Sequence, residues 1–305
     1  MKLALGTAQL GMNYGVVNRA GKPSRADAVA IVRRARVGGV TTFDCARAYG
    51  DAEEILGEAL DRNDSAVTTI TKLQLPGFPK DVKSNDVHMA VDQSIEESSR
   101  SLGVSRLPVV LLHRWDHYRA WGGAAWQRLV ELLHQGRIGA LGASVYDPEE
   151  ALDALSEPSV QHLQIPFNVL DWRWKEAGLD RAVLARPNTT VHARSVFLQG
   201  ILLTHSATDW PEIAGFDPAR ILEQLQKLAQ RFGREGLADL CLAYVRAQTW
   251  ISWLVVGCET KKQLEEDLGL CLRSRLAEAE CAELEREVPK IPVALLNPTL
   301  WGNSD

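Results

Sequence analysis

Eight short apolar or β-branched runs recur along the chain, and helix-like segments separate them. The runs cover residues 3–6, 40–44, 67–72, 108–113, 138–144, 160–166, 189–194 and 250–257. Strands that alternate with helices over short connections are typical of a parallel sheet, and eight such units in 305 residues fit a closed barrel better than an open sheet. The sequence therefore predicts an α/β fold, a (β/α)8 TIM barrel, with an open parallel sheet as the alternative.

The segments between the runs carry helix signals. Asp27, three positions after Ser24, completes a capping pattern, and two consecutive glycines end the helix that follows. Other helices are predicted at 51–61, 84–102, 121–135, 147–155, 179–186, 218–232, 237–248 and 261–272. A polar loop at 204–217 and the tail after residue 290 are predicted to be insertions over the C-terminal face of the barrel. Because no Pro/Ser-rich linker divides the chain, a single domain spanning residues 1–305 is expected.

The composition argues against several classes of protein. A formal net charge of −5 gives no reason to expect nucleic acid as a partner. The five cysteines are an odd number without a CxxC pair, which is typical of free thiols in a reducing compartment. The first residues lack a signal-peptide core, and no segment has the apolar length that spans a bilayer. A cytoplasmic protein without a membrane partner is expected, and the sequence does not indicate its oligomeric state.

Four polar side chains fall at the C-terminal ends of the second, third and fourth predicted strands, where barrel enzymes carry their active sites. Asp44, Lys72 and His113 end these strands, and Tyr49 follows the second one. Each has an ordinary explanation by itself: an aspartate that caps a turn, a lysine at a frayed strand end, a core histidine or a packing tyrosine. Their common end of the barrel favours a shared pocket.

These four groups suit the reduction of a carbonyl. A phenol has a pKa of about 10 and a nearby ammonium lowers it, so Lys72 is predicted to make Tyr49 a better proton donor. Asp44 would keep the buried Lys72 charged, and His113 would hydrogen-bond the substrate carbonyl. A hydride would come from a bound cofactor. No metal is expected: His113 and His117 have helical spacing, but the residues before them indicate a strand.

The order of motifs along the chain resembles that of the aldo-keto reductase family. The motifs are FDCARAYGDAE, ITK, LLHRWD, GAS, QIPFN, ARSVFLQGIL and VVGCETKKQLEEDL, found in the family's order from about residue 3 to 272. The resemblance implies a TIM barrel that binds NADP(H), or alternatively NAD(H), without a GxGxxG turn. It also implies that the four residues above are the catalytic tetrad, and that Ser144 and Gln164 bind the nicotinamide carboxamide.

The remaining cofactor contacts that the resemblance implies follow the seventh and eighth strands. They are Arg194, Ser195, Gly257, Cys258, Glu259, Lys261, Gln263, Glu266 and Asp267. The segment from Gly257 to Asp267 would hold the adenosine and its phosphate.

The chain departs from the family pattern in three places. Val145 replaces an asparagine that often follows the serine of the fifth strand. Arg194 stands where many members have an aromatic that stacks on the nicotinamide; a guanidinium can stack too, or bind an anionic substrate, or pair with an acid. The phosphate segment lacks the expected arginine: Lys261 and Lys262 favour NADP(H), whereas Glu259 favours a ribose hydroxyl and hence NAD(H).

Three functions compete at this point. The leading hypothesis is an NADP(H)-dependent reductase of aldehydes or ketones that acts on a small-molecule carbonyl substrate. The second is a nucleotide-binding barrel that serves as a regulatory or binding subunit, and the third is an aldolase that forms a Schiff base on Lys72. The loop at 204–217, Arg194 and the tail favour a polar or anionic carbonyl such as a sugar derivative. Tryptophans in the loops either contact the substrate or pin loops onto the barrel.

Overall fold

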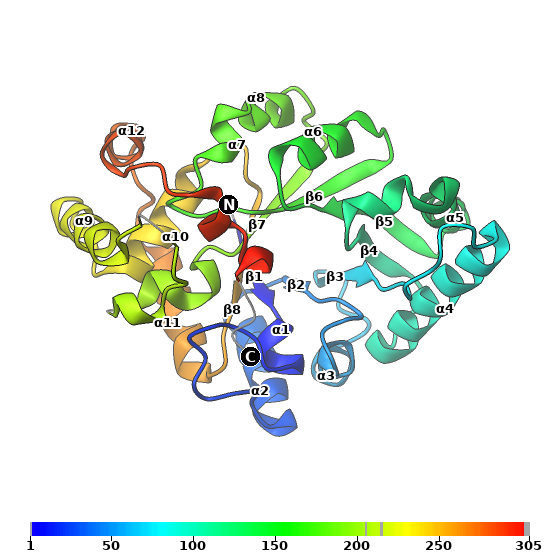
Figure 1. The fold of residues 1–305 in the computed structure, drawn as a ribbon. Helices are drawn as coiled ribbons and strands as arrows, with labels where there is room; N and C mark the ends of the chain where they lie inside the picture. Colours follow the sequence, from blue (N-terminus) through cyan, green and yellow to red (C-terminus); the bar gives the residue numbers. More distant parts are fainter. Residues whose placement is uncertain (1, 205, 214–215, 302–305) are drawn as a thin grey trace.

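The computed structural model describes residues 2–204, 206–213 and 216–301. Eight parallel strands form a closed barrel in chain order, with helices around them (Figure 1). The strands are β1 (Lys2–Gly6), β2 (Thr42–Asp44), β3 (Thr68–Leu73), β4 (Leu107–Leu112), β5 (Ile138–Ser144), β6 (Val160–Pro166), β7 (Thr190–Arg194) and β8 (Trp253–Gly257). The predicted (β/α)8 TIM barrel is confirmed, and pairing of β1 with β8 excludes the open sheet.

Helices cover the outside of the barrel. They are α1 (Ala8–Gly11), α2 (Arg25–Val37), α3 (Ala52–Ala59), α4 (Ser84–Leu102), α5 (Ala124–His134), α6 (Pro148–Ser156), α7 (Arg173–Glu176), α8 (Leu179–Leu184), α9 (Pro218–Arg231), α10 (Leu237–Ala247), α11 (Lys261–Leu272), α12 (Glu278–Glu287) and α13 (Val293–Leu296). Short 3-10 turns lie at η1 (Trp115–Tyr118), η2 (Ala120–Gly123), η3 (Leu198–Leu203), η4 (Ala207–Asp209) and η5 (Pro298–Leu300). The predicted cap of α2 is present, because Ser24 accepts a hydrogen bond from Asp27 N.

Two elements begin three residues later than the sequence predicts. The eighth strand is predicted from residue 250 but begins at Trp253, and the apolar Trp250 and Ile251 are buried in the turn before it. The helix predicted from residue 121 begins at Ala124, because Trp121 has a left-handed φ of 52°. Apolar character alone therefore does not fix where an element starts.

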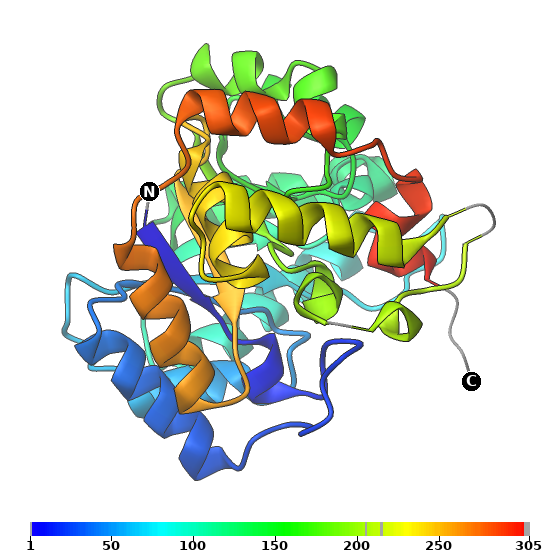
Figure 2. The same ribbon diagram turned by 90° about the vertical axis from the view of Figure 1, so that its left-hand side faces the viewer.

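Helix α12 has no counterpart in the sequence prediction. Its buried side chains are Cys281 and Leu284, so an apolar face two residues wide is hidden among glutamates. The helix lies next to α9 (Figure 2), and Arg231 at the end of α9 forms ion pairs with Glu283 and Glu287. Ion pairs with α9, rather than a strong apolar periodicity in the sequence, therefore hold α12 in place.

The segment after β7 and the tail lie over the C-terminal ends of the strands. Trp172, in the loop after β6, donates through Nε1 to Ile291 O at 3.2 Å, and Leu295 and Leu296 in α13 are fully buried. The predicted insertions over this face are confirmed. Residues 205, 214 and 215 of the predicted loop, and 302–305 of the tail, lie outside the described residues.

A pair of histidines joins β6 and β7 below the strand ends. His162 Nδ1 and His192 Nε2 are 2.9 Å apart, and the rings stack with centroids 5.2 Å apart. Burial lowers the pKa of His162 to about 4 and that of His192 well below its usual value, so both rings are neutral. Within the described chain, no helix combines the length and apolarity needed to cross a membrane.

Candidate active site

The ends of β2 and β3 bring Asp44 and Lys72 into a buried ion pair. Asp44 is in register with Ile70, so Lys72 lies two residues further along the neighbouring strand. Lys72 Nζ is 2.9 Å from both carboxylate oxygens of Asp44 and 2.8 Å from Cys45 O. The relative exposure is 4% for Asp44 and 1% for Lys72. The ammonium therefore has as many acceptors as it has hydrogens.

This pair keeps its charges. Burial acts to lower the pKa of Lys72, but the Asp44 carboxylate, with Tyr49, outweighs burial and leaves that pKa raised. Gln164 on β6 donates Nε2 to Asp44 Oδ1 at 2.7 Å, and Thr7 Oγ1 donates to Asp44 O at 2.9 Å. The Asp44 carboxylate and main chain are thus fixed by partners from three other strands or their ends.

Tyr49 lies in the turn between β2 and α3, and hydrogen bonds hold that turn on the barrel. Arg47 N donates to Lys72 O at 3.3 Å, and Tyr49 N donates to Ala46 O at 3.0 Å. The Arg47 side chain forms an ion pair with Glu53, a buried acid of α3. The opening of the acidic helix that follows Tyr49 therefore serves to anchor the turn.

Two glycines let this turn pack directly against α1. A Cβ on Gly11 would lie 1.9 Å from Tyr49 O, and a Cβ on Gly50 would lie 2.2 Å from Gly11 O. Gly50 also has a φ of 56°, in the left-handed region that favours glycine. The main chains touch only because neither position carries a side chain, and this contact sets the height of Tyr49 above the barrel.

Tyr49 lies between Lys72 and His113. Lys72 Nζ is 4.8 Å from the centroid of the Tyr49 ring. The Tyr49 and His113 rings meet edge to face, with centroids 6.0 Å apart, and His113 follows β4 by one residue. The structure thus brings together all four side chains that the sequence placed at the strand ends.

The pKa of Tyr49 corrects one sequence prediction. Burial raises that pKa to about 12; Lys72 lowers it and Asp44 raises it by less. The prediction that the ammonium makes the phenol more acidic than usual is therefore wrong, because the cost of desolvating the phenolate outweighs the attraction of the ammonium. Tyr49 keeps its proton throughout the physiological range, which is the state that a proton donor needs.

His113 is neutral at this site. Burial lowers its pKa to about 3, and the positive charges of Lys72 and Arg194 act in the same direction. A neutral imidazole carries one N–H, which can be donated to a carbonyl oxygen.

A cavity of about 530 Å³ runs from this cluster to the start of α11. Nine of the predicted site residues line it: Asp44, Tyr49, Arg194, Ser195, Gly257, Glu259, Gln263, Glu266 and Asp267. The other six are not among the lining residues: Lys72, His113, Ser144, Gln164, Cys258 and Lys261. The length of the cavity, with the cluster at one end, suits an extended ligand.

The far end of the cavity is formed by the first turn of α11. Gln263 Oε1 accepts hydrogen bonds from Glu259 N at 2.9 Å and Thr260 N at 3.0 Å, so this side chain caps the helix while it lines the cavity. Lys261 and Lys262 are exposed on the same turn and do not line the cavity.

Three carboxylates of this segment line the cavity: Glu259, Glu266 and Asp267. Burial raises the pKa of Asp267 to about 7, and the neighbouring charges of Glu266 and Glu259 add to the rise. The cations among the described lining residues are Arg19 and Arg194, and neither belongs to α11. The far end is therefore acidic.

Gln164 has an unused acceptor beside Ser144. The two residues are in register on β5 and β6, with exposures of 2% for Ser144 and 0% for Gln164. Gln164 Nε2 is bonded to Asp44, but among the described residues the buried Oε1 has no hydrogen-bond partner. A carboxamide N–H placed here would satisfy this oxygen, so Gln164 fits the nicotinamide contact that the resemblance implies.

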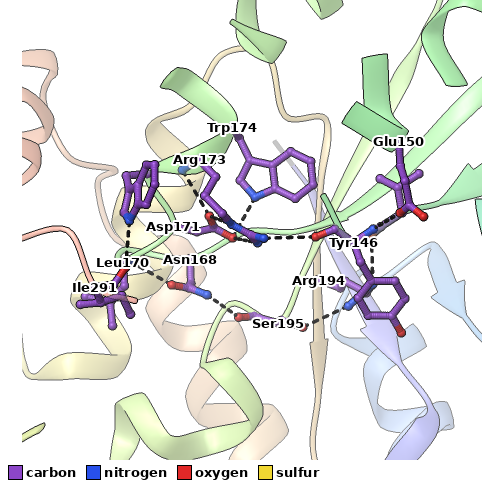
Figure 3. Close-up of polar contacts among 12 residues, drawn as sticks. Tyr146, Glu150, Asn168, Leu170, Asp171, Arg173, Trp174, Arg194, Ser195 and Ile291 are labelled. Atoms are coloured by element: carbon purple, nitrogen blue, oxygen red, sulfur yellow. Dashed lines mark hydrogen bonds and ion pairs between the residues drawn. The ribbon is translucent and has the colours of Figure 1, made fainter. Parts of the chain in front are cut away.

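Arg194 extends from the end of β7 across β6 to the end of β5. Its Nη2 donates to Val145 O at 3.2 Å, and its guanidinium carbon is 4.4 Å from the centroid of the Tyr146 ring (Figure 3). The Val145 side chain is buried in the core, and the residue contacts Arg194 through its main-chain carbonyl. The adjacent Ser195 has a φ of 58°, and its carbonyl accepts a hydrogen bond from Asn168 Nδ2 at 3.4 Å.

A buried network holds Tyr146 in place. Asp171 accepts two hydrogen bonds from the Arg173 guanidinium, each 2.8 Å long, and one from Trp174 Nε1 at 2.9 Å. Arg173 Nη1 also donates to Tyr146 O at 3.4 Å, and Tyr146 N donates to Glu150 Oε2 at 2.8 Å (Figure 3). Hydrogen bonds to both the N–H and the carbonyl of Tyr146 thus fix the residue on whose ring Arg194 stacks.

Residues that the sequence did not indicate reach the cavity from the loop after β1. Tyr14 lines the cavity, and burial raises its pKa. Arg19 forms an ion pair of 3.0 Å with Asp209, which links the loops after β1 and β7 over the cavity. No motif marks these residues, because they meet the site only through contacts between distant loops.

The tryptophans act as packing residues. None of those in the described chain lines the cavity. Trp115 stacks on Tyr118 with ring centroids 4.3 Å apart, and Trp126 meets Trp115 edge to face. Of the two roles that the sequence left open, the one that pins loops onto the barrel is supported.

Comparisons with known proteins agree with this geometry. The model of the Aldo/keto reductase family matches residues 2–287. An uncharacterized oxidoreductase of Mycobacterium tuberculosis is 31% identical over 309 residues, which cover 94% of this chain and 91% of that protein. The L-glyceraldehyde 3-phosphate reductase of Escherichia coli is 24% identical over 319 residues, which cover 94% of this chain and 90% of that protein.

Solved structures share the fold. The holo form of an aldo-keto reductase from Bacillus halodurans has a TM-score of 0.75 at 17% identity, covering 95% of this chain and 93% of that one. The glycerol dehydrogenase of Gluconobacter oxydans has a TM-score of 0.72 at 20% identity, with the same coverage of 95% and 93%. With the family model matched over nearly the whole chain, this protein belongs to the aldo-keto reductase family, and it is an oxidoreductase that uses a nicotinamide cofactor to interconvert carbonyl compounds and alcohols.

Proposed function

We propose that Tyr49, Lys72, Asp44 and His113 are the catalytic groups of a reductase of aldehydes or ketones. The observation that carries the proposal is their mutual arrangement: a charged lysine held by an aspartate, 4.8 Å from the ring of a protonated tyrosine that borders a neutral histidine. A proton donor backed by a fixed positive charge suits a reaction in which negative charge develops on a carbonyl oxygen.

Each residue has a separate task. The nicotinamide, when bound, supplies the hydride. His113 donates its N–H to the carbonyl oxygen and orients it. Tyr49 gives its proton to the same oxygen as the alkoxide forms, since an alkoxide is a stronger base than a phenolate. Lys72 stabilises the phenolate that remains, and Asp44 keeps Lys72 charged. In the oxidative direction the proton returns to Tyr49.

The bonding of Lys72 disfavours the aldolase hypothesis. A lysine that forms a Schiff base attacks as the neutral amine, which requires a lowered pKa and a free lone pair. The pKa of Lys72 is raised, and its three hydrogens are bonded to Asp44 and Cys45 O. The complete cluster likewise disfavours a purely regulatory barrel.

The choice between the two nicotinamide cofactors rests on the far end of the cavity. The sequence prediction of NADP(H) depends on Lys261 and Lys262, and it stays a prediction. The charge of the cavity wall favours NAD(H) as a second candidate, because Glu259, Glu266 and Asp267 line the cavity and the lysines do not. Carboxylates repel a 2′-phosphate and accept a hydrogen bond from a ribose hydroxyl.

Parallel titrations with NADH and NADPH, followed by tryptophan fluorescence, test this choice. From the acidic wall we expect NADH to bind more tightly, and we expect Glu259→Gln to narrow the difference. Tighter binding of NADPH, weakened by Lys261→Ala, would support the sequence prediction instead. Glu58→Gln, an exposed acid of α3 outside the cavity, is the matched control.

A Tyr49→Phe variant tests the catalytic assignment. We expect kcat to fall by about 10²–10⁴-fold, the usual contribution of a proton donor, while cofactor binding is retained. Tyr118→Phe is a matched control, because the Tyr118 hydroxyl bonds Glu157 at 2.9 Å and lies outside the cavity. A Tyr49→Phe enzyme that oxidises the reduced cofactor as fast as the parent would contradict the proposal.

The relatives suggest where a substrate screen should begin. The Escherichia coli relative is named for L-glyceraldehyde 3-phosphate, and the Gluconobacter structure for glycerol. We therefore propose a small polar carbonyl compound as the substrate. We also propose a cytoplasmic location, which is supported by five cysteines that are all unpaired.

A further inference from the structure

The cavity contains a cation that has no anionic partner. Arg194 lines the cavity together with Tyr49. Its contacts are Val145 O at 3.2 Å, Ser195 Oγ at 3.4 Å and the Tyr146 ring at 4.4 Å, all of them uncharged. Among the residues described, no ion pair involves Arg194, although its guanidinium is half-buried. A partly buried charge without a counter-ion is unfavourable until a ligand supplies one.

The other cations that the structure describes around the site are already paired. Lys72 is neutralised by Asp44 at 2.9 Å, and Arg19, the other lining cation, meets Asp209 at 3.0 Å. Arg114, which follows His113, bonds Asp116 at 2.7 Å. Among the described residues that line the cavity, Arg194 is therefore the cation whose charge is not neutralised by an ion pair.

The direction of Arg194 indicates which part of a bound complex it meets. The barrel order is β5, β6, β7 and β8, and α11 follows β8. From β7, Arg194 extends toward β5, where it bonds Val145 O, and thus away from the acidic far end of the cavity. His113 follows β4, the next strand in that direction. The guanidinium is accordingly directed toward the side of the barrel where His113 would hold the carbonyl.

The position of Arg194 is prepared before any ligand binds. Its guanidinium stacks on Tyr146, whose N–H and carbonyl are bonded to Glu150 and Arg173 (Figure 3). Arg173 is in turn held by two hydrogen bonds of 2.8 Å to Asp171. A side chain that is already ordered loses less conformational entropy when it binds an anion.

We propose that Arg194 is a specificity-determining residue that binds a carboxylate or phosphate group on the carbonyl substrate. The inference rests on the proposed reductase function. A guanidinium has five N–H donors in a planar fork that matches two oxygens of such a group, and two acceptors leave several donors free. A neutral substrate would leave the charge of Arg194 unpaired.

The kinetic test compares pairs of substrates in which only one member carries an anionic group. One pair is glyceraldehyde 3-phosphate and glyceraldehyde, and the other is 4-carboxybenzaldehyde and its methyl ester. We expect kcat/KM to be about 10- to 100-fold higher for the anionic member of at least one pair, the size of a charge-assisted hydrogen bond. The pair that shows the preference distinguishes phosphate from carboxylate.

Variants at two arginines localise the preference. Arg194→Met should bring the two members of the selective pair to similar kcat/KM, and Arg194→Lys should retain part of the difference, because it keeps the charge without the planar fork. Arg114→Met is the control, since Arg114 is a neighbouring cation that already has a partner, and it should leave the ratio unchanged. A ratio near one in the parent enzyme, or a ratio unchanged in Arg194→Met, would overturn the inference.

Binding measurements separate this inference from the proposed function. Calorimetric titration with glycerol 3-phosphate and 4-(hydroxymethyl)benzoate, against glycerol and the neutral methyl ester, reports anion binding without turnover. Selective anion binding that Arg194→Met removes would support the inference even if no carbonyl were reduced, a result that would count against the reductase alone. Loss of NADH binding in Arg194→Met, with substrate selectivity intact, would show instead that Arg194 serves the cofactor.

Discussion

The contact between Gly11 and the turn of Tyr49 allows the position of the proposed proton donor to be changed without altering its chemistry. In Gly11→Ala, the new Cβ would lie 1.9 Å from Tyr49 O and 2.7 Å from Ala52 N. An ordinary contact is 3.4 Å or longer, so the gap must open by the difference, about 1.5 Å. Both obstacles are main-chain atoms, which have no rotamer to change. The turn that carries Tyr49 and helix α1 must therefore move apart.

A displacement of this size has a calculable effect on catalysis. Misplacement of a reacting group by 1 Å can cost about 100-fold in rate, so we expect Gly11→Ala to lower kcat by about 100-fold or more. Overpacking should also lower the free energy of unfolding by about 1–3 kcal/mol. The assay is cofactor oxidation at saturating substrate, with urea unfolding measured in parallel on the same preparation.

A control separates loss of geometry from loss of stability. Gly139 is the second residue of β5, at the opposite end of the barrel, and a Cβ there would lie 2.4 Å from Pro108 O. Gly139→Ala should therefore destabilise the fold by a similar amount while the folded enzyme keeps its kcat. If Gly11→Ala retained kcat within about threefold of the parent, or if both variants lost kcat equally, the reasoning that the glycine contact positions Tyr49 would be refuted.

Further predictions concern the charges around the site. Lys72→Met should lower the free energy of unfolding by about 3–5 kcal/mol, because it leaves the buried Asp44 carboxylate without its counter-ion. Adding Asp44→Asn should recover part of this loss. Urea unfolding of the single and double variants measures the recovery, and its absence would show that the ion pair is unimportant for stability. The free energy of unfolding should fall as the pH drops below 6.5. In the folded protein, His113 and His162 have pKa values of about 3 and about 4 and the pKa of His192 is also lowered, so all three rings stay neutral. In the unfolded chain the same rings bind protons below pH 6.5. Urea midpoints that do not change between pH 7 and pH 5 would contradict this. With cofactor and substrate both saturating, kcat for carbonyl reduction should be nearly independent of pH from about 5 to 9, because neither Tyr49 nor His113 titrates in that range, and Asp267, whose pKa is about 7, lies at the far end of the cavity.

The strand ends were predictable because a barrel obeys a simple rule. A buried parallel strand is a run of apolar and β-branched residues, so the polar residue that ends each run is visible in the sequence, as Asp44, Lys72 and His113 show. Parallel strands in a closed barrel end on one face, and the clustering of these residues follows from topology alone. The fold and the clustering of the candidate site residues could therefore both be predicted from the sequence.

Features that depend on contacts between loops were not predictable. Nothing near Gly11 indicates that its missing side chain makes room for Tyr49 O, because the two residues meet only after the barrel closes. The same is true of the ion pair between Arg19 and Asp209. The predicted direction of the pKa shift of Tyr49 was wrong for a related reason. The direction depends on how much water the folded chain excludes from the phenol, and the neighbouring charges alone do not reveal this.

The seam between β1 and β8 has a bearing on how the chain is made. Residues Lys2–Gly6 pair with Trp253–Gly257, so a ribosome delivers one side of this seam first and the other side after all the remaining strands. Until β8 leaves the exit tunnel, β1 and β7 both expose an unpaired edge, and such edges are open to wrong partners. The nascent protein is therefore an incomplete sheet for most of its synthesis. Gly257, at the end of this seam, also lines the cavity in which a dinucleotide would bind, so the barrel and the cavity wall are completed together.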